Sequence, residues 1–275
     1  MKPINKIDSI NICGIFKNNA NYLKSFFVPM MNKLIILHEE LDFYFYFFVD
    51  TGDDDTDDVL KRFVKGKKGS QVKVDSRPGK RYKRGTDLLR IKNIERARNE
   101  LLHLRPYKGD VTMFVDSDVF FDMNLINRFM SREYPTDTAQ VSCNGKDHVT
   151  CQAHRGQCKH YYDTLALIDM NAKLGYNFTR TSGFQCCPFE DQTDRDNWFA
   201  GKLVQVKSAF GGVSFYRTDL INNTDLTYNI KTHIVYVHDK SDLFCEHWDF
   251  NREIQQDGEF KIYVDPKLIV CNLEV

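Results

Sequence analysis

The feature that most constrains the fold is an apolar run, residues 111–121, in which two aspartates interrupt a series of Val, Met and Phe. Continuous apolar runs of this kind are typical of central strands covered on both faces, as in α/β proteins. Because side chains two positions apart on a strand point to the same side, Asp116 and Asp118 are expected to lie together. In open α/β sheets, ligands bind at the carboxyl ends of the strands.

A pair of carboxylates at a strand end is suited to a hard divalent cation. Mg²⁺ and Mn²⁺ prefer oxygen ligands, and a cation held in this way can bind a diphosphate. Asp116 and Asp118 are therefore predicted metal ligands, with Mn²⁺ or Mg²⁺ as the cofactor. The alternative interpretation is a solvated strand end, because an Asp-x-Asp pair alone is common.

The chain ahead of this run alternates between strand-like and helix-like segments. Residues 9–16 resemble a buried strand, residues 21–37 carry apolar side chains at helical spacing, and residues 43–49 are strongly β-prone. A short amphipathic helix is expected to follow, up to Val64. This alternation is the opening of a nucleotide-binding α/β sheet. No G-x-G-x-x-G or Walker pattern is present, which argues against dehydrogenases and P-loop enzymes.

A long helix is expected over residues 86–104, directly ahead of the apolar run. Arg96 and Arg98 lie near its middle. Most helix arginines are surface charges, but this helix is expected to pack beside the following strand. An arginine on it could then reach a diphosphate or orient the first aspartate. The predicted buried face consists of Arg90, Ile94, Ala97, Leu101 and Leu104.

Composition limits the class of protein. A chain of 275 residues with 42% hydrophobic and 28% charged residues can form one large α/β domain or two small ones. Its net charge of zero argues against a nucleic-acid binder that neutralises phosphates. No apolar run approaches the ~20 residues that span a bilayer, and the N-terminus lacks a signal-peptide core. A reducing, cytoplasmic location is expected, with the eight cysteines as free thiols.

Several segments, taken in order, resemble the GT-A fold of nucleotide-sugar-dependent glycosyltransferases. The closest similarity is to the small soluble transferases of large DNA viruses of algae and amoebae (chlorovirus-like), which build capsid glycans. The resemblance covers nearly the whole chain. The matching segments are the first strand, an acidic turn at 49–53, an Ala-Arg-Asn helix at 94–99, the Asp-x-Asp run at 114–118, a glycine loop at 208–217, an acidic motif at 245–250 and a closing strand at 262–270.

The resemblance implies a GT-A type α/β fold, with a Rossmann-like mixed central sheet flanked by helices. Residues 1–275 would form a single glycosyltransferase domain. Residues 1–121 would be its nucleotide-binding half and residues 122–275 its acceptor-binding half. The long polar segment at 141–198 would be an acceptor-side insert, since loops of that length are usually functional.

The resemblance also implies a donor-binding set. Asp50 would hydrogen-bond the base, and main chain near Phe16 would line the nucleotide. Asp118 would bind the metal directly, while Asp116 would contact the ribose or a metal-bound water and pair with Arg96 or Arg98. The glycines of the glycine loop would allow close backbone approach to the donor sugar because they lack Cβ. The full set is Phe16, Asp50, Arg96, Arg98, Asp116, Ser117, Asp118, Gly211 and Gly212.

The acidic motif is expected to supply the general base. An inverting transferase needs a base that takes the proton of the acceptor hydroxyl. The usual Glu-Asp pair reads Glu246-His247 here, and Glu246 is the favoured base. His247, Asp249 and Asp191, the last in a second Glu-Asp pair, are the rival candidates. No histidine follows His247, where many family members have a metal-binding one. Either His247 or Asn272 would then complete the metal shell, or Asp118 and water would hold the metal weakly.

The leading hypothesis is a metal-dependent, inverting glycosyltransferase. It would move a hexosyl or pentosyl group from a nucleotide sugar, with a UDP-sugar favoured, to a glycan acceptor. One alternative is a nucleotidyltransferase, but that class normally opens with a Gly-rich loop containing Arg or Lys, which this chain lacks. The other is a non-catalytic glycan-binding module, which would bind no nucleotide.

Overall fold

The computed structural model of the chain describes residues 2–50, 52–75, 88–147, 161, 166–174, 187–223, 225–230, 235–236, 242–243 and 245–272. The strands are β1 (Ser9–Phe16), β2 (Asp42–Val49), β3 (Gln71–Val74), β4 (Val111–Val115), β5 (Val119–Phe121), β6 (Thr138–Asp147), β7 (Ile168–Asp169), β8 (Val204–Ser208), β9 (Val213–Arg217), β10 (Val235–Tyr236), β11 (Asp242–Leu243) and β12 (Lys261–Asn272). The helices are α1 (Ala20–Tyr22), a π-helical turn (Leu23–Phe27), α2 (Val28–Leu37), α3 (Thr56–Val64), α4 (Leu88–Leu102), α5 (Leu125–Ser131), α8 (Gln192–Phe199), α9 (Thr218–Ile221), α10 (His247–Ile254) and a 3-10 turn (Gln256–Gly258).

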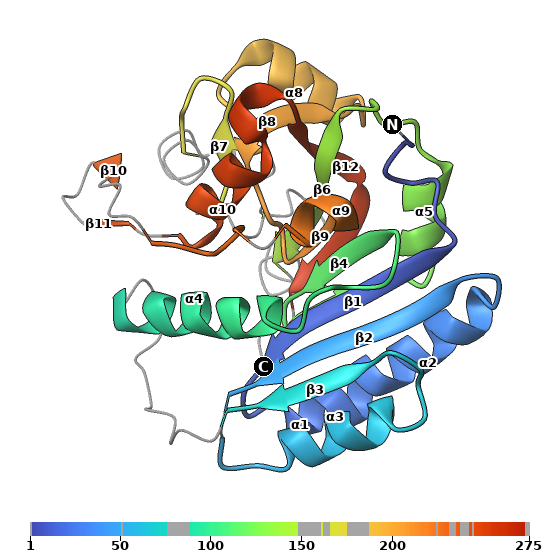
Figure 1. The fold of residues 1–275 in the computed structure, drawn as a ribbon. Coiled ribbons are helices and arrows are strands. Elements are labelled where there is room, and N and C mark those ends of the chain that lie inside the picture. The colour runs from blue at the N-terminus through green and yellow to red at the C-terminus, as the bar shows by residue number, and fades with distance from the viewer. Residues whose placement is uncertain are drawn as a thin grey trace.

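One mixed sheet runs through the described part of the chain (Figure 1). Its strand order is β3-β2-β1-β4-β9-β6-β12-β8-β7, and β5 pairs with β12 outside this path. Strands β3, β2, β1 and β4 are mutually parallel, so their carboxyl ends meet at one edge of the sheet. β9 is antiparallel to β4, with Val213 opposite Val115. The loop that enters β9 therefore lies beside the residues that leave β4.

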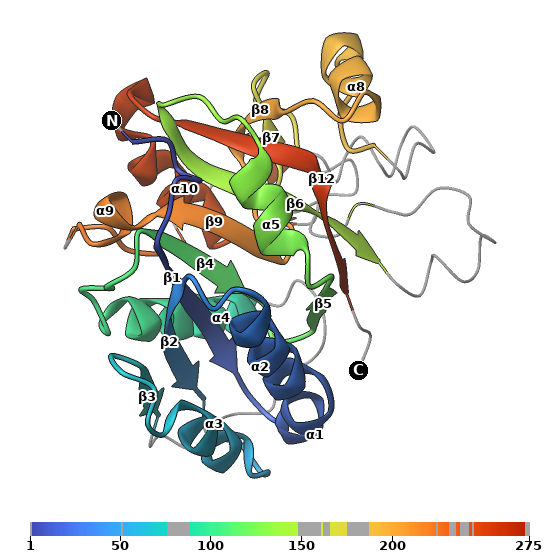
Figure 2. The same ribbon diagram turned by 90° about the vertical axis from the view of Figure 1, so that its right-hand side faces the viewer.

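Helices cover both faces of this sheet, and successive strand residues face alternate cores. On β2, Phe45 and Phe47 belong to one core, and Tyr46 and Phe48 belong to the other. The first core contains side chains of α2, α3 and α5, and the second contains side chains of α4 and α10. Figures 1 and 2 show α2 and α4 on opposite sides of the sheet. The run of aromatic residues in β2 is thus explained by burial on both faces.

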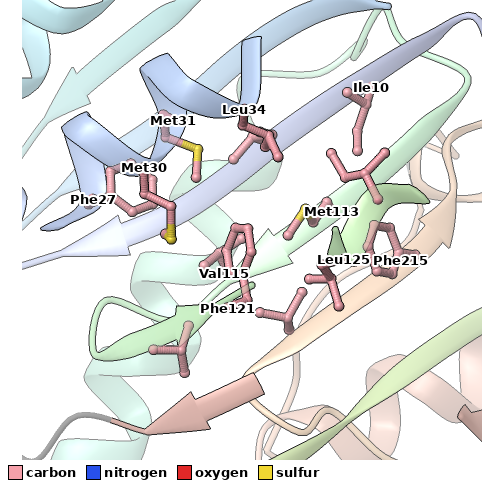
Figure 3. Packing of buried hydrophobic residues seen from close by; sticks show 14 of the residues in the cluster. Ile10, Phe27, Met30, Met31, Leu34, Met113, Val115, Phe121, Leu125 and Phe215 are labelled. Atoms are coloured by element: carbon pink, nitrogen blue, oxygen red, sulfur yellow. The ribbon is translucent and has the colours of Figure 1, made fainter. Parts of the chain in front are cut away.

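In the first core, side chains of α2 pack against β4, the strand that leads to the Asp-x-Asp pair. Met30, Met31 and Leu34 of α2 belong to the same buried cluster as Met113 and Val115 of β4 (Figure 3). All five side chains are at most 4% exposed. Such close apolar packing fixes the end of β4, from which the acidic residues project.

The predicted fold class is confirmed: the sheet is mixed, central and flanked by helices. The predicted helix over 21–37 is a continuous helical stretch formed by α1, the π-helical turn and α2. The short helix ending at Val64 is α3, and the closing strand predicted over 262–270 is part of β12. Among the described residues, no helix is long and apolar enough to cross a bilayer. Half of the predicted insert at 141–198 lies outside the described residues.

The strand predicted to end in the Asp-x-Asp pair is confirmed: β4 ends at Val115, and a turn separates it from β5. The N–H of Asp116 donates to the carbonyl of Gly212, which extends the antiparallel pairing of β4 with β9 by one residue. The predicted buried face of α4 is partly wrong: Ala97 and Leu101 are buried, but Arg90 is exposed and Ile94 is only half-buried. The buried residues described on α4 are Ile91, Ala97, Arg98, Leu101 and Leu102, and the buried arginine has carboxylate partners.

Candidate active site

Three aspartates follow three strands at the carboxyl edge of the parallel part of the sheet. Asp50 follows β2, Asp75 follows β3 and Asp116 follows β4. Their backbones extend the ladder: the N–H of Asp50 donates to the carbonyl of Phe16, and that of Asp75 to the carbonyl of Val49, each at 2.9 Å. Parallel pairing therefore gathers carboxylates from distant parts of the sequence at one edge.

Arg96 and Lys17 hold the first two of these carboxylates. Arg96 Nη2 lies 3.1 Å from Asp50 Oδ1, and Lys17 Nζ lies 2.7 Å from Asp50 Oδ2. The other terminal nitrogen of Arg96 binds Asp75, whose side chain is 7% exposed. Asp50 is thus flanked by two cationic donors, and Arg96 bridges the ends of β2 and β3.

The turn that carries the Asp-x-Asp pair is fixed on two sides. On one side, the N–H of Asp116 donates to the carbonyl of Gly212 at 2.9 Å. On the other, the hydroxyl of Tyr22 donates to the carbonyl of Val119 at 2.5 Å. Gly211 has φ of +67°, and a Cβ on it would lie 2.1 Å from the carbonyl oxygen of Cys143. The glycine loop therefore packs against main chain and supports Asp116 directly.

Arg98 lies at the centre of the site and binds two carboxylates. Its Nη2 is 3.1 Å from Asp116 Oδ1, and its Nε is 3.0 Å from Glu246 Oε1. The guanidinium lies over the rings of Phe210 and Tyr228, 4.8 and 5.6 Å from their centroids. Burial opposes its charge, but Glu246 and Asp116 outweigh burial and raise the pKa of Arg98. Of the two arginines considered as partners of Asp116, Arg98 is the one that pairs with it.

Glu246 and His247 stand where α10 begins. Glu246 makes no side-chain capping hydrogen bond to α10 and is turned to Arg98 instead. His247 is 2% exposed, and its ring stacks on Phe210 with centroids 4.2 Å apart. Its Nε2 is 3.5 Å from Glu246 Oε1, and its Nδ1 has no hydrogen-bond partner among the described residues. Burial and the charge of Arg98 hold the pKa of His247 well below its ordinary value, which favours a neutral ring.

The two remaining base candidates have other partners. Asp249, on α10, is 3% exposed and forms an ion pair with Arg252 at 2.7 Å. Asp191 is the N-cap of α8 and accepts hydrogen bonds from the N–H groups of Thr193 and Asp194. Figures 1 and 2 show α8 well away from α4, the helix that carries Arg98. The structure therefore does not bring Asp191 together with the Arg98 cluster.

The predicted three-residue metal set is not gathered in the structure. In the part of the chain that the structure describes, no group of three or more His, Cys, Asp and Glu side chains could hold a metal ion. His247 packs against Phe210 and Glu246 rather than joining Asp116 and Asp118.

The two aspartates alone fit a cation of the predicted kind. Mg²⁺ is commonly held by one or two carboxylates together with substrate phosphates rather than by an all-protein cage. Burial raises the pKa of Asp118, so a cation beside it would offset the cost of its charge. Ser117, between them, is half-buried in the same turn.

Phe16 can serve a ligand only through its main chain. Its side chain is 2% exposed and packs edge-on against Phe27 and Phe47. Sequence reasoning missed Lys17, Tyr22 and Asp75. A signal existed for Asp75, because it follows a short β-prone run. Nothing local indicated that Tyr22, one turn into a helix, would bind the chain after the Asp-x-Asp pair.

Comparison with known proteins gives similar folds only. No protein-family model and no curated protein sequence matches the chain. The structure resembles Staphylococcus aureus TarS 1-349, with a TM-score of 0.51 and 12% identity, covering 96% of this chain and 60% of that one. The same fragment in complex with UDP gives the same values. The mannosyltransferase PcManGT from Pyrobaculum calidifontis, in complex with GDP-Man and Mn²⁺, has a TM-score of 0.50 and 9% identity, covering 99% of this chain and 59% of that one.

The chain thus spans about three fifths of the length of the solved structures it resembles. At such low identity the likeness is one of fold. The chain has the GT-A glycosyltransferase fold.

Proposed function

We propose that the chain is a metal-dependent glycosyltransferase that moves a sugar from a nucleotide-sugar donor to a glycan acceptor. The observation that carries this proposal is the link between Asp116, Arg98 and Glu246 on a GT-A fold. This link connects the pair of Asp116 and Asp118, which suits a cation and a diphosphate, with Glu246, which suits an acceptor hydroxyl. Both lie at the sheet edge where ligands of α/β folds bind.

We assign the donor to the side of the site formed by Asp50, Asp116 and Asp118. Asp50 would accept from the base, and its two cationic neighbours Lys17 and Arg96 would suit a base with carbonyl oxygens, as uracil has. The structural relatives support the assignment, since TarS is solved with UDP and PcManGT with GDP-Man and Mn²⁺. When bound, Mn²⁺ or Mg²⁺ would neutralise charge on the departing diphosphate. We favour a UDP-sugar as donor.

We assign the general base to Glu246 and infer an inverting reaction. Glu246 would take the proton of the acceptor hydroxyl as the hydroxyl oxygen bonds to C1 of a hexosyl or pentosyl group and the C1–oxygen bond to the diphosphate breaks. The side chain of His247 is less suited, because it is buried and stacked. Asp249 is engaged by Arg252, and Asp191 caps α8.

Donor hydrolysis tests the class of activity. The protein is incubated with a panel of UDP- and GDP-sugars and Mn²⁺, and free nucleotide is quantified. Slow nucleotide release from one donor, lost when a chelator is added, is the expected result. No release and no nucleotide binding across the panel would contradict the proposal and favour a glycan-binding module.

A matched pair of variants on α10 tests the base. Glu246→Gln is expected to lower turnover at least ~100-fold, the usual contribution of general base catalysis. Glu253→Gln makes the same change on the same helix and is expected to leave turnover unchanged. Equal, mild effects of both substitutions would reject Glu246 as the base and return attention to His247, Asp249 and Asp191.

We also propose that the chain is similar to the chlorovirus-like capsid-glycan transferases and that it is cytoplasmic. A reducing compartment is consistent with Cys13 and Cys143, which are buried free thiols. Assaying capsid-type glycans beside unrelated acceptors would test the first proposal, since transfer restricted to other acceptors would contradict it.

A further inference from the structure

We propose that Arg98 is a positioning residue that couples the donor side of the site to the acceptor side. Through Arg98, a ligand bound at Asp116 would influence Glu246, and a change at Glu246 would influence binding at Asp116. The inference rests on the proposed function for the identity of the two sides. It goes beyond that function by predicting an energetic link between the two carboxylates through the guanidinium.

Geometry makes Arg98 a rigid connector. It uses Nη2 for Asp116 and Nε for Glu246, at 3.1 and 3.0 Å. These two nitrogens belong to one planar group, so neither hydrogen bond can be reoriented without moving the other. Lysine, with a single ammonium on a flexible stem, would not link the orientations of the two hydrogen bonds in this way.

The surroundings leave the guanidinium little freedom. Phe210 and Tyr228 flank it at 4.8 and 5.6 Å. Tyr228 is itself fixed to α4 by Asn99, the residue after Arg98, through two hydrogen bonds of 2.8 Å with its main chain. Phe210 is held by stacking on His247. The flanking aromatic residues are therefore anchored to α4, which carries Arg98, and to α10, at whose start Glu246 lies.

Burial turns this geometry into an energetic coupling. The side chains of Arg98 and Glu246 are 7% and 8% exposed, and that of Asp116 is 20% exposed. With either carboxylate neutralised, Arg98 keeps one charged partner. With both neutralised, a buried cation is left unpaired, which costs far more than the loss of either partner. The effects on stability of neutralising Asp116 and Glu246 should therefore not be additive.

The same link predicts how nucleotide binding depends on Glu246. A divalent cation and nucleotide at Asp116 would share the carboxylate that Arg98 binds, and the cation has the same sign of charge as Arg98. Glu246 would then stabilise the guanidinium in place of Asp116. Neutralising Glu246 should therefore weaken nucleotide binding.

The first experiment needs no ligand. Urea unfolding of Asp116→Asn, Glu246→Gln and the double variant is measured with a chelator present. We expect the double variant to lower the unfolding midpoint by more than the sum of the two single changes. Adding Arg98→Met to the double variant should raise the midpoint again, because the unpaired buried charge is removed. Additive midpoints with no recovery by Arg98→Met would overturn the coupling.

The second experiment measures UDP affinity with Mn²⁺ by calorimetry. Glu246→Gln is expected to weaken UDP binding at least ~5-fold, the lower end of usual coupling between sites. In an Arg98→Gln background, the same change should have no effect on affinity. Glu253→Gln is the control and should leave affinity unchanged in both backgrounds.

The two outcomes that matter are distinguishable. Equal UDP affinity of wild type and Glu246→Gln would overturn the coupling while leaving the proposed function intact. Absence of UDP binding in the wild type would overturn the proposed donor instead, and the ligand-free unfolding experiment would still decide whether Arg98 couples the two carboxylates.

Discussion

Asp118 shows that the residue most suited to hold a cation is also costly to the folded chain. Burial raises the pKa of this carboxyl in the folded protein above its value in the unfolded chain. The folded state therefore binds a proton more tightly than the unfolded state. The stability of the folded protein falls as pH rises between the two pKa values, and the penalty is fully present above the folded-state pKa. A bound cation would remove this penalty.

Replacing Asp118 with Asn should therefore separate stability from activity. With a chelator present, the variant is expected to unfold at a higher midpoint than wild type at pH 7. The difference should vanish near pH ~4, where an unshifted aspartate becomes protonated. Turnover should be lost because the carboxylate is absent. A stabilised variant that retained full turnover would contradict the metal role of Asp118.

His247 provides a second residue-scale prediction, with the opposite sign. Burial and Arg98 lower its pKa in the folded state, so below about pH 6.5 the unfolded chain binds a proton that the folded chain does not. Stability should rise with pH up to that value and then level, with a slope contribution of up to about 1.4 kcal/mol per pH unit.

The test is the free energy of unfolding against pH for wild type and His247→Phe, which keeps a ring beside Phe210. The other histidines are the same in both proteins, so the difference between the two curves reports His247. Parallel curves from pH 5 to 8 would show that His247 is not held neutral in the folded protein.

At the scale of elements, the glycine loop fixes the position of the Asp-x-Asp turn. Gly211 has positive φ, and an added Cβ would meet the main chain of Cys143, which cannot rotate away. Gly258 also has positive φ, +96°, but nothing lies within 4 Å of its added Cβ. A side chain at Gly258 would thus cause backbone strain alone, whereas a side chain at Gly211 would cause the same strain and also a steric clash.

Gly258→Ala is expected to cost about 1–2 kcal/mol of unfolding free energy, the usual cost of left-handed backbone for a side chain. Gly211→Ala should cost about 1–3 kcal/mol more, because the loop must also move. That movement should weaken UDP binding, since Gly212 accepts from the N–H of Asp116. Equal costs for the two alanines would show that the contact with Cys143 is unimportant.

The elements were largely predictable because their signals are local. Apolar runs gave the strands over 9–16 and 43–49, and helical spacing indicated the helix over 21–37. The end of the central strand at the Asp-x-Asp pair was predicted as well, because the apolar run is interrupted there. The contact of Asp116 with Gly212 was not predictable, because the two residues lie far apart along the chain.

The residues of the site could be predicted, but the ion pairs between them could not. Asp116, Glu246 and Arg98 were named from motifs, whereas the bridge between them joins residues 148 positions apart. Pairing Arg96 with Asp75 likewise required the strand order, which brings the ends of β2 and β3 together. The sequence pattern identified acidic and basic residues without showing which of them share a partner.

At the scale of the molecule, the nucleotide-binding half and the acceptor-binding half share one sheet. β4 pairs with β9, and β5 pairs with β12, so each half supplies strands to the other. No boundary in the described residues separates the halves over 1–121 and 122–275 into independent sheets.

We therefore expect the two halves to unfold together. Both tryptophans, Trp198 and Trp248, are buried and belong to the second half, so their fluorescence reports that half alone. Far-ultraviolet circular dichroism reports the whole chain. The two urea transitions should coincide, and UDP with Mn²⁺ should shift both equally, even though the assigned donor residues Asp50 and Asp116 belong to the first half. A fluorescence transition that stayed in place while circular dichroism shifted would show that the halves fold separately, and the coupling through Arg98 would then have to act between two independently stable units.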